Sequence, residues 1–405
     1  MEHNKEKFKY YKIVMLVVLT AFITFLLTSI IMYSYMKNNE EQPEEIATTY
    51  TVDNIDEAIQ PYRNIIDKYY LGEIDENALI EGAIKGYVDG LNDPYTEYIS
   101  KEEMQDYTED LLGNFVGIGV YMVANTEVNR IQVLSPIKDS PAEKAGIQPG
   151  DYIIKVNDVE YTAEQMTEAS NVIKGEEGTT VKLQLLREDK TLDLEITREE
   201  VETNPLTSEV LENNIGYIGI TSFDENSAEG FKKKLEELQK QNISSLIIDL
   251  RNNGGGIVDE AIEIAECIVD KDSTLLITTN KDGKEEITKS DKDPIINMPI
   301  VVLVNENSAS ASEILAGALK DLQKATLVGT TTYGKGVIQN FMTLRNGSGI
   351  KVTTEEYFTP NRQKINEVGI EPNEVVELPE DVQNQLIVEK DKDTQLQKAI
   401  ELLKK

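Results

Sequence analysis

The stretch Ser308-Ala309-Ser310-Ala311-Ser312-Glu313 decides the fold of the second half of this chain. The apolar residues after it recur at the spacing of one helix face: Ile314, Leu315, Ala318, Leu319 and Leu322. The spacing predicts a helix whose first turn lies beside Ser310, with unpaired backbone N–H groups and the positive end of the helix dipole facing it. Such an environment favours a nucleophile whose attack creates an oxyanion.

Ser310 also fits a simpler role, because Ser-x-x-Glu is the pattern of a capping box. The composition of the chain favours the chemical interpretation. The only histidine is His3, ahead of a long apolar stretch, and the only cysteine, Cys267, has no histidine to pair with. A Ser–His–Asp triad therefore cannot be assembled, and a serine hydrolase built from this chain needs another base, for which lysine is an established variant.

Lys335 is the best candidate for that base. It lies between two glycines in Tyr333-Gly334-Lys335-Gly336-Val337-Ile338-Gln339, shortly after the apolar run 325–328. Glycines let the backbone turn tightly and bring a side chain into a confined space. A lysine accepts a proton only when it is neutral, so burial must lower its pKa from an ordinary value of about 10.4. We predict that Ser310 and Lys335 are the two halves of a serine–lysine active site.

Several ligand classes are not expected. Residues 329–335 fit the opening of a P-loop, but the next residue is Gly336 where Ser or Thr must ligate magnesium, and residues 337–342 look extended. The formal net charge of −33, from 40 basic and 73 acidic residues, argues against nucleic acid. The sequence has no His-rich or Cys-rich cluster and no His-Glu-x-x-His. We expect no metal and no cofactor.

The N-terminal region predicts a membrane anchor. Residues 13–35 carry no charge and are long enough to span a bilayer. Four lysines in residues 1–12 precede them, which predicts a cytoplasmic tail and places everything after residue 36 outside the cytoplasm. A cleaved signal peptide is the alternative, although the apolar run is long and no Ala-x-Ala follows it. We predict a single-pass protein of the cell membrane, with an acidic linker at 36–52.

The remaining chain reads as an α/β multi-domain protein. Residues 53–110 show helical periodicity, with Gly90 closing a second helix and a turn at 93–95. Their tyrosines Tyr87, Tyr95 and Tyr98 are interpreted as packing residues. Residues 111–200 form a β-rich run of short strands, residues 201–380 a strand–helix–strand pattern, and residues 381–405 a charged C-terminal helix.

The β-rich part carries motifs that resemble a PDZ domain. They are Gly117-Ile118-Gly119-Val120 and, further on, Ser140-Pro141-Ala142-Glu143-Lys144-Ala145-Gly146-Ile147 followed by Gln148-Pro149-Gly150-Asp151. Glycines in the first loop would let successive N–H groups converge on the terminal carboxylate of a peptide, which adds as a strand to the sheet edge. The resemblance implies peptide contacts from Ile118, Gly119 and Val120.

A wider resemblance covers residues 60–376. The order of an anchor, a helical segment, a PDZ-like module, Asp-Leu-Arg-Asn-Asn-x-Gly-Gly from Asp249, Ser-Ala-Ser-Ala-Ser-Glu-Ile and Gly-Lys-Gly-x-x-Gln resembles the carboxyl-terminal processing peptidases, the tail-specific serine proteases. It implies a protease core of the crotonase-like, tail-specific type. Ser310 would be the nucleophile, Lys335 the general base and Gln339 the residue that orients the lysine. Gly255 and Ala311 would form the oxyanion hole, with the choice of glycine within 254–256 left open.

The same resemblance implies partners. Protein substrates would be bound by their C-termini through the PDZ-like domain, and the chain would form a homodimer with the 53–110 helices as contact surface. Arg187 is either a link between the PDZ-like domain and the core or a surface charge. The sequence departs from the family pattern at Gly254, often a proline, at 361–362, usually a glycine turn, and at Asn373, commonly aspartate. These departures concern loop geometry.

One physical condition follows for Gln339. On one regular strand Lys335 and Gln339 would be about 13 Å apart. A contact between them therefore requires a turn or a bulge. Two other functions remain open from the sequence: a catalytically silent PDZ adaptor at the membrane, and an anchored hydrolase of small esters.

Overall fold

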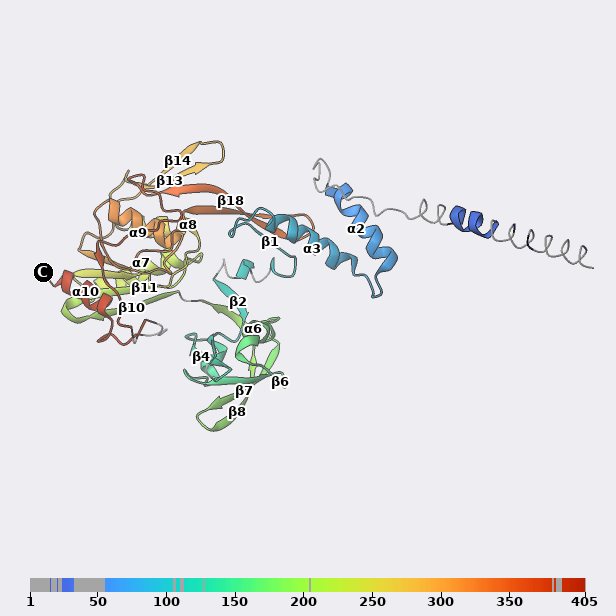
Figure 1. The fold of residues 1–405 in the computed structure, drawn as a ribbon. Helices are drawn as coiled ribbons and strands as arrows, with labels where there is room; N and C mark the ends of the chain where they lie inside the picture. The colour runs from blue at the N-terminus through green and yellow to red at the C-terminus, as the bar shows by residue number, and fades with distance from the viewer. Residues whose placement is uncertain are drawn as a thin grey trace, which may run out of the picture. The chain divides into compact units, whose positions relative to one another are not determined.

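The computed structural model describes residues 15, 20, 24–32, 55–104, 107–109, 113–126, 128–203, 205–380, 382–383 and 388–404 (Figure 1). The predicted tail 1–12 and linker 36–52 lie outside the described residues, as does most of the predicted anchor 13–35. A search of the described part of the chain finds no helix long and apolar enough to cross a bilayer. The chain divides into two compact units, residues 1–76 and residues 77–405.

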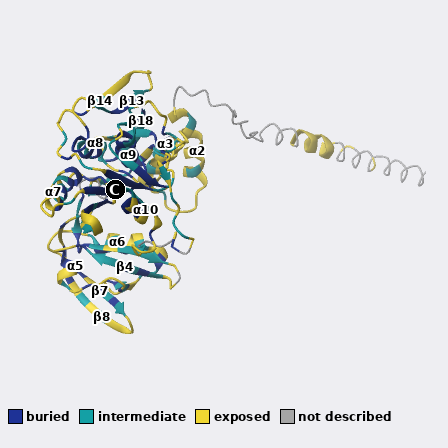
Figure 2. Ribbon diagram, turned by 90° about the vertical axis from the view of Figure 1, so that its left-hand side faces the viewer, coloured by how far each residue is buried: buried dark blue, intermediate teal, exposed yellow. Residues whose placement is uncertain are grey.

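The first unit contains helix α2 (Ile55–Tyr69), which buries none of its side chains. Five of its apolar residues follow the predicted helical spacing and are exposed: Ile55, Ile59, Tyr62, Ile65 and Tyr69. Figure 2 shows most of this helix as exposed. The helix therefore presents an apolar face that nothing in its own unit covers. Helix α3 (Glu76–Asp89) follows and ends before Gly90, as the sequence predicts.

A six-stranded sheet forms the centre of the second unit. Its strand order is β10 (Leu206–Leu211), β11 (Ile215–Ile220), β12 (Ser245–Asp249), β15 (Ile300–Val304), β16 (Thr326–Gly329) and β19 (Glu374–Val375). β10 pairs antiparallel with β11, and every other pair is parallel. β12 and β15 are buried along their whole length, which explains their uninterrupted apolar sequence.

Helices cover both faces of this sheet. Alternate residues such as Ile248 and Val302 pack in one core with α7 (Ser227–Gln239), α8 (Val258–Glu266) and α9 (Ala311–Asp321). The intervening residues, such as Ile247, pack with α10 (Thr394–Leu403) on the other face. The charged helix predicted at the C-terminus is therefore part of the hydrophobic core, because its Leu396, Ala399 and Ile400 lie on one buried face.

The second unit contains another mixed-order sheet, whose strands come from both ends of the unit. It contains β1 (Glu97–Ile99), β18 (Gly349–Phe358), β13 (Thr274–Asn280) and β14 (Glu285–Lys289), and β17 (Val337–Thr343) also pairs with β18. The prediction that residues 53–110 are helical is wrong at β1, which pairs antiparallel with β18. Three residues are too few to show a period of two in the sequence.

The PDZ-like domain has a separate core. Its sheet order is β3 (Val120–Asn125), β4 (Arg130–Pro136), β5 (Tyr152–Val156), β7 (Thr180–Arg187) and β8 (Lys190–Thr197), with β6 (Val159–Glu160) against β5. Helices α5 (Pro141–Lys144) and α6 (Met166–Ile173), with a 3₁₀ turn η1 (Ala163–Gln165), complete it. β2 (Asn114–Gly117) and β9 (Glu199–Glu202) pair where the chain enters and leaves this domain.

Candidate active site

Three segments singled out in the sequence meet at one edge of the central sheet. The glycine loop 254–256 follows β12, Ser310 follows β15, and Lys335 lies in the segment after β16. These three strands are adjacent and parallel. The carboxyl ends of parallel strands share one edge, which is where α/β proteins place their binding sites. The fold therefore brings the predicted nucleophile, base and oxyanion loop to the same edge.

Ser310 is the N-cap residue of α9 and has an unusual backbone, with φ 57° and ψ −116°. A positive φ is costly for a residue other than glycine and persists only where the surroundings hold it. The neighbouring serines do this. Ser308 donates its hydroxyl to the carbonyl of Leu250 (2.7 Å), and Ser312 to the carbonyl of Asn253 (2.9 Å), and both are fully buried. Ser310 is half-buried and distinct from them.

Glu313 joins the main chains of the two candidate catalytic residues. Its Oε2 accepts the backbone N–H of both Ser310 and Lys335, each at 2.9 Å. Its Oε1 accepts the N–H of Gly334 at 2.8 Å and the hydroxyl of Thr332 at 2.6 Å. The side chain has no exposed surface, and these four donors compensate for the burial of a carboxylate. Glu313 therefore does more than cap the N-terminus of α9, because it also holds the segment that contains Lys335.

Tyr357 bridges the same two segments from their carbonyl side. Its hydroxyl lies 2.6 Å from the carbonyl oxygen of Lys335 and 3.1 Å from that of Ser310. Burial, reinforced by the charge of Glu313, raises the pKa of Tyr357 well above its ordinary value, so the hydroxyl keeps its proton and donates it. Ser310 and Lys335 are thus held together through backbone N–H and C=O groups alike.

The glycines around Lys335 are required by close packing. A Cβ on Gly336 would lie 2.1 Å from the backbone nitrogen of Asn366. Gly334 has φ +89°, and a Cβ there would lie 3.0 Å from the backbone nitrogen of Gly369. The segment 366–369 therefore packs directly against the backbone on both sides of the lysine, as the two glycines predict.

The side chain of Lys335 points to an aromatic ring. Its Nζ lies 4.9 Å from the ring centroid of Tyr95, a cation–π geometry. Among the described residues, Nζ forms no hydrogen bond with the Oγ of Ser310. The amine and the alcohol are therefore in neighbouring segments but not in contact. Tyr95 was interpreted as a packing residue, and nothing in the sequence indicates its partner.

The electrostatic surroundings of Lys335 favour its neutral form. Burial lowers its pKa, and the positive charge of Lys351 lowers it further. The carboxylates of Glu313 and Asp93 act in the opposite direction but do not prevail. A lysine that acts as a base needs this direction of shift.

Among the described residues, Gln339 forms no hydrogen bond with the side chain of Lys335. Its Nε2 lies 3.3 Å from the hydroxyl of Thr353 and 3.4 Å from the carbonyl of Val337. The register of β17 against β18 shifts between Ile338 and Gln339, so Thr353 pairs with Gln339 and one residue of β18 is skipped. The expected irregularity therefore exists, but the extra residue is on β18 and does not shorten the path from Lys335 to Gln339.

The candidate oxyanion hole is close to the nucleophile. A Cβ on Gly255 would lie 2.8 Å from the Cβ of Ser310 and 3.1 Å from the backbone nitrogen of Ala311. The N–H of Gly255 donates to Oδ1 of Asn253 at 2.8 Å. The N–H of Ala311 donates to no group in the described part of the chain. Ala311 therefore has a donor to offer in this structure, whereas the donor of Gly255 is engaged.

A buried ion-pair network supports the glycine loop. The guanidinium of Arg251 lies 2.6 Å from Oδ2 of Asp249 and 2.9 Å from Oδ2 of Asp393, the N-cap residue of α10. Although burial alone lowers it, these two carboxylates raise the pKa of Arg251. The network ties the start of the glycine loop to the C-terminal helix. Sequence reasoning missed it because Asp393 is remote in the chain.

The predicted peptide-binding loop begins with Ile118, whose side chain has no exposed surface and belongs to the domain core. A peptide contact from Ile118 would therefore come from its backbone. Gly119 has φ +77°, and a Cβ there would lie 2.4 Å from the Cβ of Ser140, which requires glycine. Val120 is half-buried at the start of β3, the edge strand. The N–H groups of Ile118 and Gly119 donate to no described group, so what the loop offers a ligand is its backbone.

Arg187 lies at the surface of the PDZ-like domain and pairs with a buried carboxylate there. It binds Asp151 through two hydrogen bonds (2.7 and 2.8 Å) and the carbonyl of Gly146 (2.7 Å). Of the two predicted roles, the surface charge is confirmed, because the side chain is 30% exposed, and the hydrogen bonds it makes among the described residues stay within the PDZ-like domain. Its partner Asp151 is 1% exposed, and a buried carboxylate needs such a cation.

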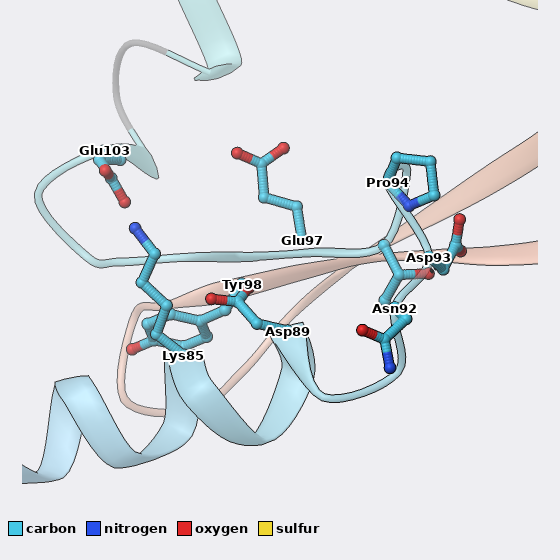
Figure 3. Close-up of a pocket in the computed structure, with 9 residues that line it drawn as sticks. Lys85, Asp89, Asn92, Asp93, Pro94, Glu97, Tyr98 and Glu103 are labelled. Atoms are coloured by element: carbon cyan, nitrogen blue, oxygen red, sulfur yellow. Dashed lines mark hydrogen bonds between the residues drawn. The ribbon is translucent and has the colours of Figure 1, made fainter.

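A pocket of about 510 Å³ lies elsewhere in the second unit. Figure 3 shows its polar lining, which comes from α3, the turn after it and the strand β1. Neither Ser310 nor Lys335 lines it. The turn contributes Asp93 and Thr96 to the pocket wall.

The fold and site define a class: a serine hydrolase with an α/β core, a serine at a helix start, a half-buried lysine in the neighbouring segment and an attached PDZ-like domain. Comparisons with known proteins agree. The family model for peptidase family S41 matches residues 214–376, the PDZ domain model residues 132–187, and the model called activating protease CtpB N-terminal domain residues 17–103.

The chain is similar to two proteases of Bacillus subtilis (strain 168). It is 38% identical to the carboxy-terminal processing protease CtpA over 326 residues, which is 80% of this chain and 69% of CtpA. It is 35% identical to CtpB over 334 residues, 81% of this chain and 68% of CtpB. A solved "Putative S41 protease" from Bacteroides fragilis NCTC 9343 shares the fold, with a TM-score of 0.55 at 17% identity over 87% of this chain and 98% of that one. This chain belongs to the carboxy-terminal processing proteases of peptidase family S41, and it is a serine peptidase with a PDZ domain.

Proposed function

We propose that this chain is a membrane-anchored endopeptidase that recruits protein substrates by their C-termini and cleaves them with Ser310 and Lys335. The observation that carries the proposal is the double bridge between the two residues, in which Glu313 accepts both backbone N–H groups and Tyr357 lies against both carbonyls. The main chain of the lysine is thereby held beside that of the serine, which limits the catalytic rearrangement to the side chain of Lys335 and the glycine loop.

The chemistry would proceed through an acyl-enzyme. The Oγ of Ser310 attacks the peptide carbonyl carbon while neutral Lys335 takes its proton. The N–H of Ala311 and a donor from the glycine loop hold the oxyanion. Lys335 returns the proton to the leaving amine as the C–N bond breaks. Water then attacks the ester, with Lys335 taking the water proton and restoring it to Ser310.

In the structure the amine of Lys335 lies against the ring of Tyr95, and the N–H of Gly255 donates to the side chain of Asn253. Catalysis therefore requires a local rearrangement. We infer that this is a resting arrangement. Substrate binding would turn Lys335 to Ser310 and free a glycine donor. Gln339, held by Thr353, would support the lysine after that turn.

The PDZ domain would capture the substrate tail. Unpaired backbone N–H groups at Ile118 and Gly119 face no acceptor in the described part of the domain, which suits a terminal carboxylate. The exposed edge of β3, beginning at Val120, would accept the peptide as an added strand.

Anchoring and dimer formation are part of the same proposal. The uncharged stretch 13–35 after a lysine-rich tail supports a single-pass protein with its catalytic part outside the cytoplasm. The exposed apolar face of α2 supports a homodimer in which a second copy covers that face. Reporter fusions on both sides of residues 13–35 test the topology, and light scattering of Ile59→Glu against wild type tests the dimer.

Ser310→Ala and Lys335→Ala test the catalytic assignment. Each should abolish cleavage of an unstructured protein such as casein and leave binding of a C-terminal peptide unchanged. Equal cleavage by wild type and both variants contradicts the dyad. Peptide binding without any cleavage by wild type favours the silent PDZ adaptor, and turnover of short esters that survives loss of the PDZ domain favours an esterase.

A further inference from the structure

The turn between α3 and β1 reaches the side chain of Lys335, the candidate base. The carboxylate of Asp93 caps this turn by accepting the N–H of Tyr95 at 3.1 Å and the hydroxyl of Thr96 at 2.6 Å. Thr96 is buried and Tyr95 half-buried. The positions of both side chains are therefore set by the turn itself. We call residues 93–96 the Asp93–Thr96 turn.

One side of the Asp93–Thr96 turn meets Lys335. The ring of Tyr95 lies 4.9 Å from the amine and covers it. Burial first, then a hydrogen bond with Tyr333 and the charges of Glu313 and Asp93, raise the pKa of Tyr95 to about 12. The phenol therefore stays neutral and places an uncharged, largely apolar ring against the lysine.

The other side of the turn meets Gln339 through a chain of three hydrogen bonds. The Nε2 of Gln339 donates to the hydroxyl of Thr353 (3.3 Å), and the N–H of Thr353 donates to the hydroxyl of Thr96 (3.1 Å). The hydroxyl of Thr96 donates in turn to Asp93 (2.6 Å). Each hydroxyl accepts one bond and Thr96 donates the next, so the chain ends on a carboxylate that needs donors.

We propose that the Asp93–Thr96 turn is a positioning element of the active site, with Tyr95 holding and covering the amine of Lys335 and Thr96 fixing the strand that holds Gln339. This inference rests on the proposed role of Lys335 as the base. It assigns to the N-terminal segment a part in catalysis beyond contact between subunits. The turn completes a site whose other parts come from residues far away in the chain.

The groups that face Lys335 determine the sign of the expected effect. They are the carboxylates of Glu313 and Asp93, the ammonium of Lys351 and the ring of Tyr95. The hydroxyl of Tyr333 meets that of Tyr95, and the hydroxyl of Tyr357 lies on the backbone carbonyl of Lys335. Removing the ring admits water to the amine, which favours the charged lysine. It also removes the cation–π attraction, which disfavours the charged form by roughly two- to fivefold. The access of water to the amine outweighs the lost attraction, since burial shifts the protonation equilibrium of a lysine by up to several powers of ten. The pKa of Lys335 should therefore rise when the ring is removed.

Tyr95→Ala in the full-length chain tests the proposal through the pH profile of kcat/KM for fluorescein-labelled casein. The wild-type profile should rise with pH as Lys335 loses its proton. A midpoint that moves one pH unit higher makes the variant about tenfold slower than wild type near neutral pH. The two should approach the same kcat/KM at alkaline pH. Tyr95→Phe keeps the ring and should follow the wild-type profile. Tyr87→Ala, which truncates an exposed tyrosine on α3, is the matched control.

Thr96 provides a second test. Thr96→Val removes the hydroxyl that joins Thr353 to Asp93 and should lower kcat more than it changes KM, whereas Thr96→Ser should restore wild-type kcat. If Tyr95→Ala does not fold, as judged by thermal unfolding, Tyr95→Ser replaces it, because it also removes the ring and admits water, and it should show the same profile shift.

The outcomes separate this inference from the proposed function. A Tyr95→Ala profile lowered by one factor at every pH, or unchanged, overturns the positioning role. Labelling of Ser310 by a fluorophosphonate distinguishes the alternatives, because persistence of labelling in Lys335→Ala overturns the lysine base itself. Loss of labelling in Lys335→Ala together with an unshifted Tyr95→Ala profile overturns only the inference.

Discussion

Glu313→Gln is the perturbation that the geometry of the site predicts most sharply. The carboxylate accepts four hydrogen bonds, two on each oxygen. The amide oxygen of a glutamine can still accept the N–H groups of Ser310 and Lys335. The amide NH₂ then faces the N–H of Gly334, and two donors cannot form a hydrogen bond. Loss of that bond costs about 1.5–3 kcal/mol, and the remaining bonds lose their charge assistance at about 1 kcal/mol each. The local opening free energy of α9 should fall by about 3–6 kcal/mol.

Hydrogen exchange of the α9 amides measures this quantity locally, which matters in a multi-domain chain whose unfolding is not two-state. The rate at which a fluorophosphonate labels Ser310 should fall together with this opening free energy. Glu306→Gln is the matched control, since that exposed glutamate before α9 accepts one hydrogen bond, from Thr330 after β16, and its substitution should change stability by about 0.5 kcal/mol or less. A change below about 1 kcal/mol for Glu313→Gln, with unaltered reactivity of Ser310, would refute the bridging role.

Three further predictions follow from the described contacts. Lys351→Gln removes a charge that lowers the pKa of Lys335, so the pH profile of kcat/KM should move to higher pH, and a profile that stays in place or moves to lower pH contradicts the electrostatic account. Gly119→Ala should abolish binding of a C-terminal peptide in a fluorescence titration, whereas Gly178→Ala, with a similar φ of +79° but no atom within 4 Å of its Cβ, should cost only about 1–2 kcal/mol and retain binding. Arg251→Met leaves two buried carboxylates without their cation and should destabilise α10 by about 3–5 kcal/mol in hydrogen exchange, and unchanged protection there is the contrary result.

The elements that the sequence predicts best are those with an unambiguous period. The strands β7 and β11 have such sequences, because β7 alternates apolar and polar residues and β11 is an uninterrupted apolar run. The three-residue strand β1 was not predictable, because its existence depends on the partner β18. The burial of α10 also depends on a partner, since a charged amphipathic helix can face water or a sheet with the same pattern.

The site was predictable where the chain supplies a local signal. Ser310 at a helix start and Lys335 between two glycines are visible in the sequence, and parallel strands bring them to one edge. The contact of Tyr95 with Lys335 has no local signal, because neither residue type nor spacing specifies a partner so far along the chain. The sequence predicts only part of the role of Glu313, since a capping box accounts for one of its four hydrogen bonds.

The pH dependence of Ser310 acylation tests the central claim most directly. The full-length wild type and Lys335→Ala would be mixed with a fluorophosphonate in single-turnover experiments across neutral and alkaline pH. The account predicts that the wild-type rate rises through one ionisation below the ordinary lysine pKa, because burial and Lys351 favour the neutral amine. Lys335→Ala should be slower by about 10²–10⁴-fold and lack that ionisation. A Lys335→Ala rate that keeps the same ionisation and magnitude would contradict a lysine base.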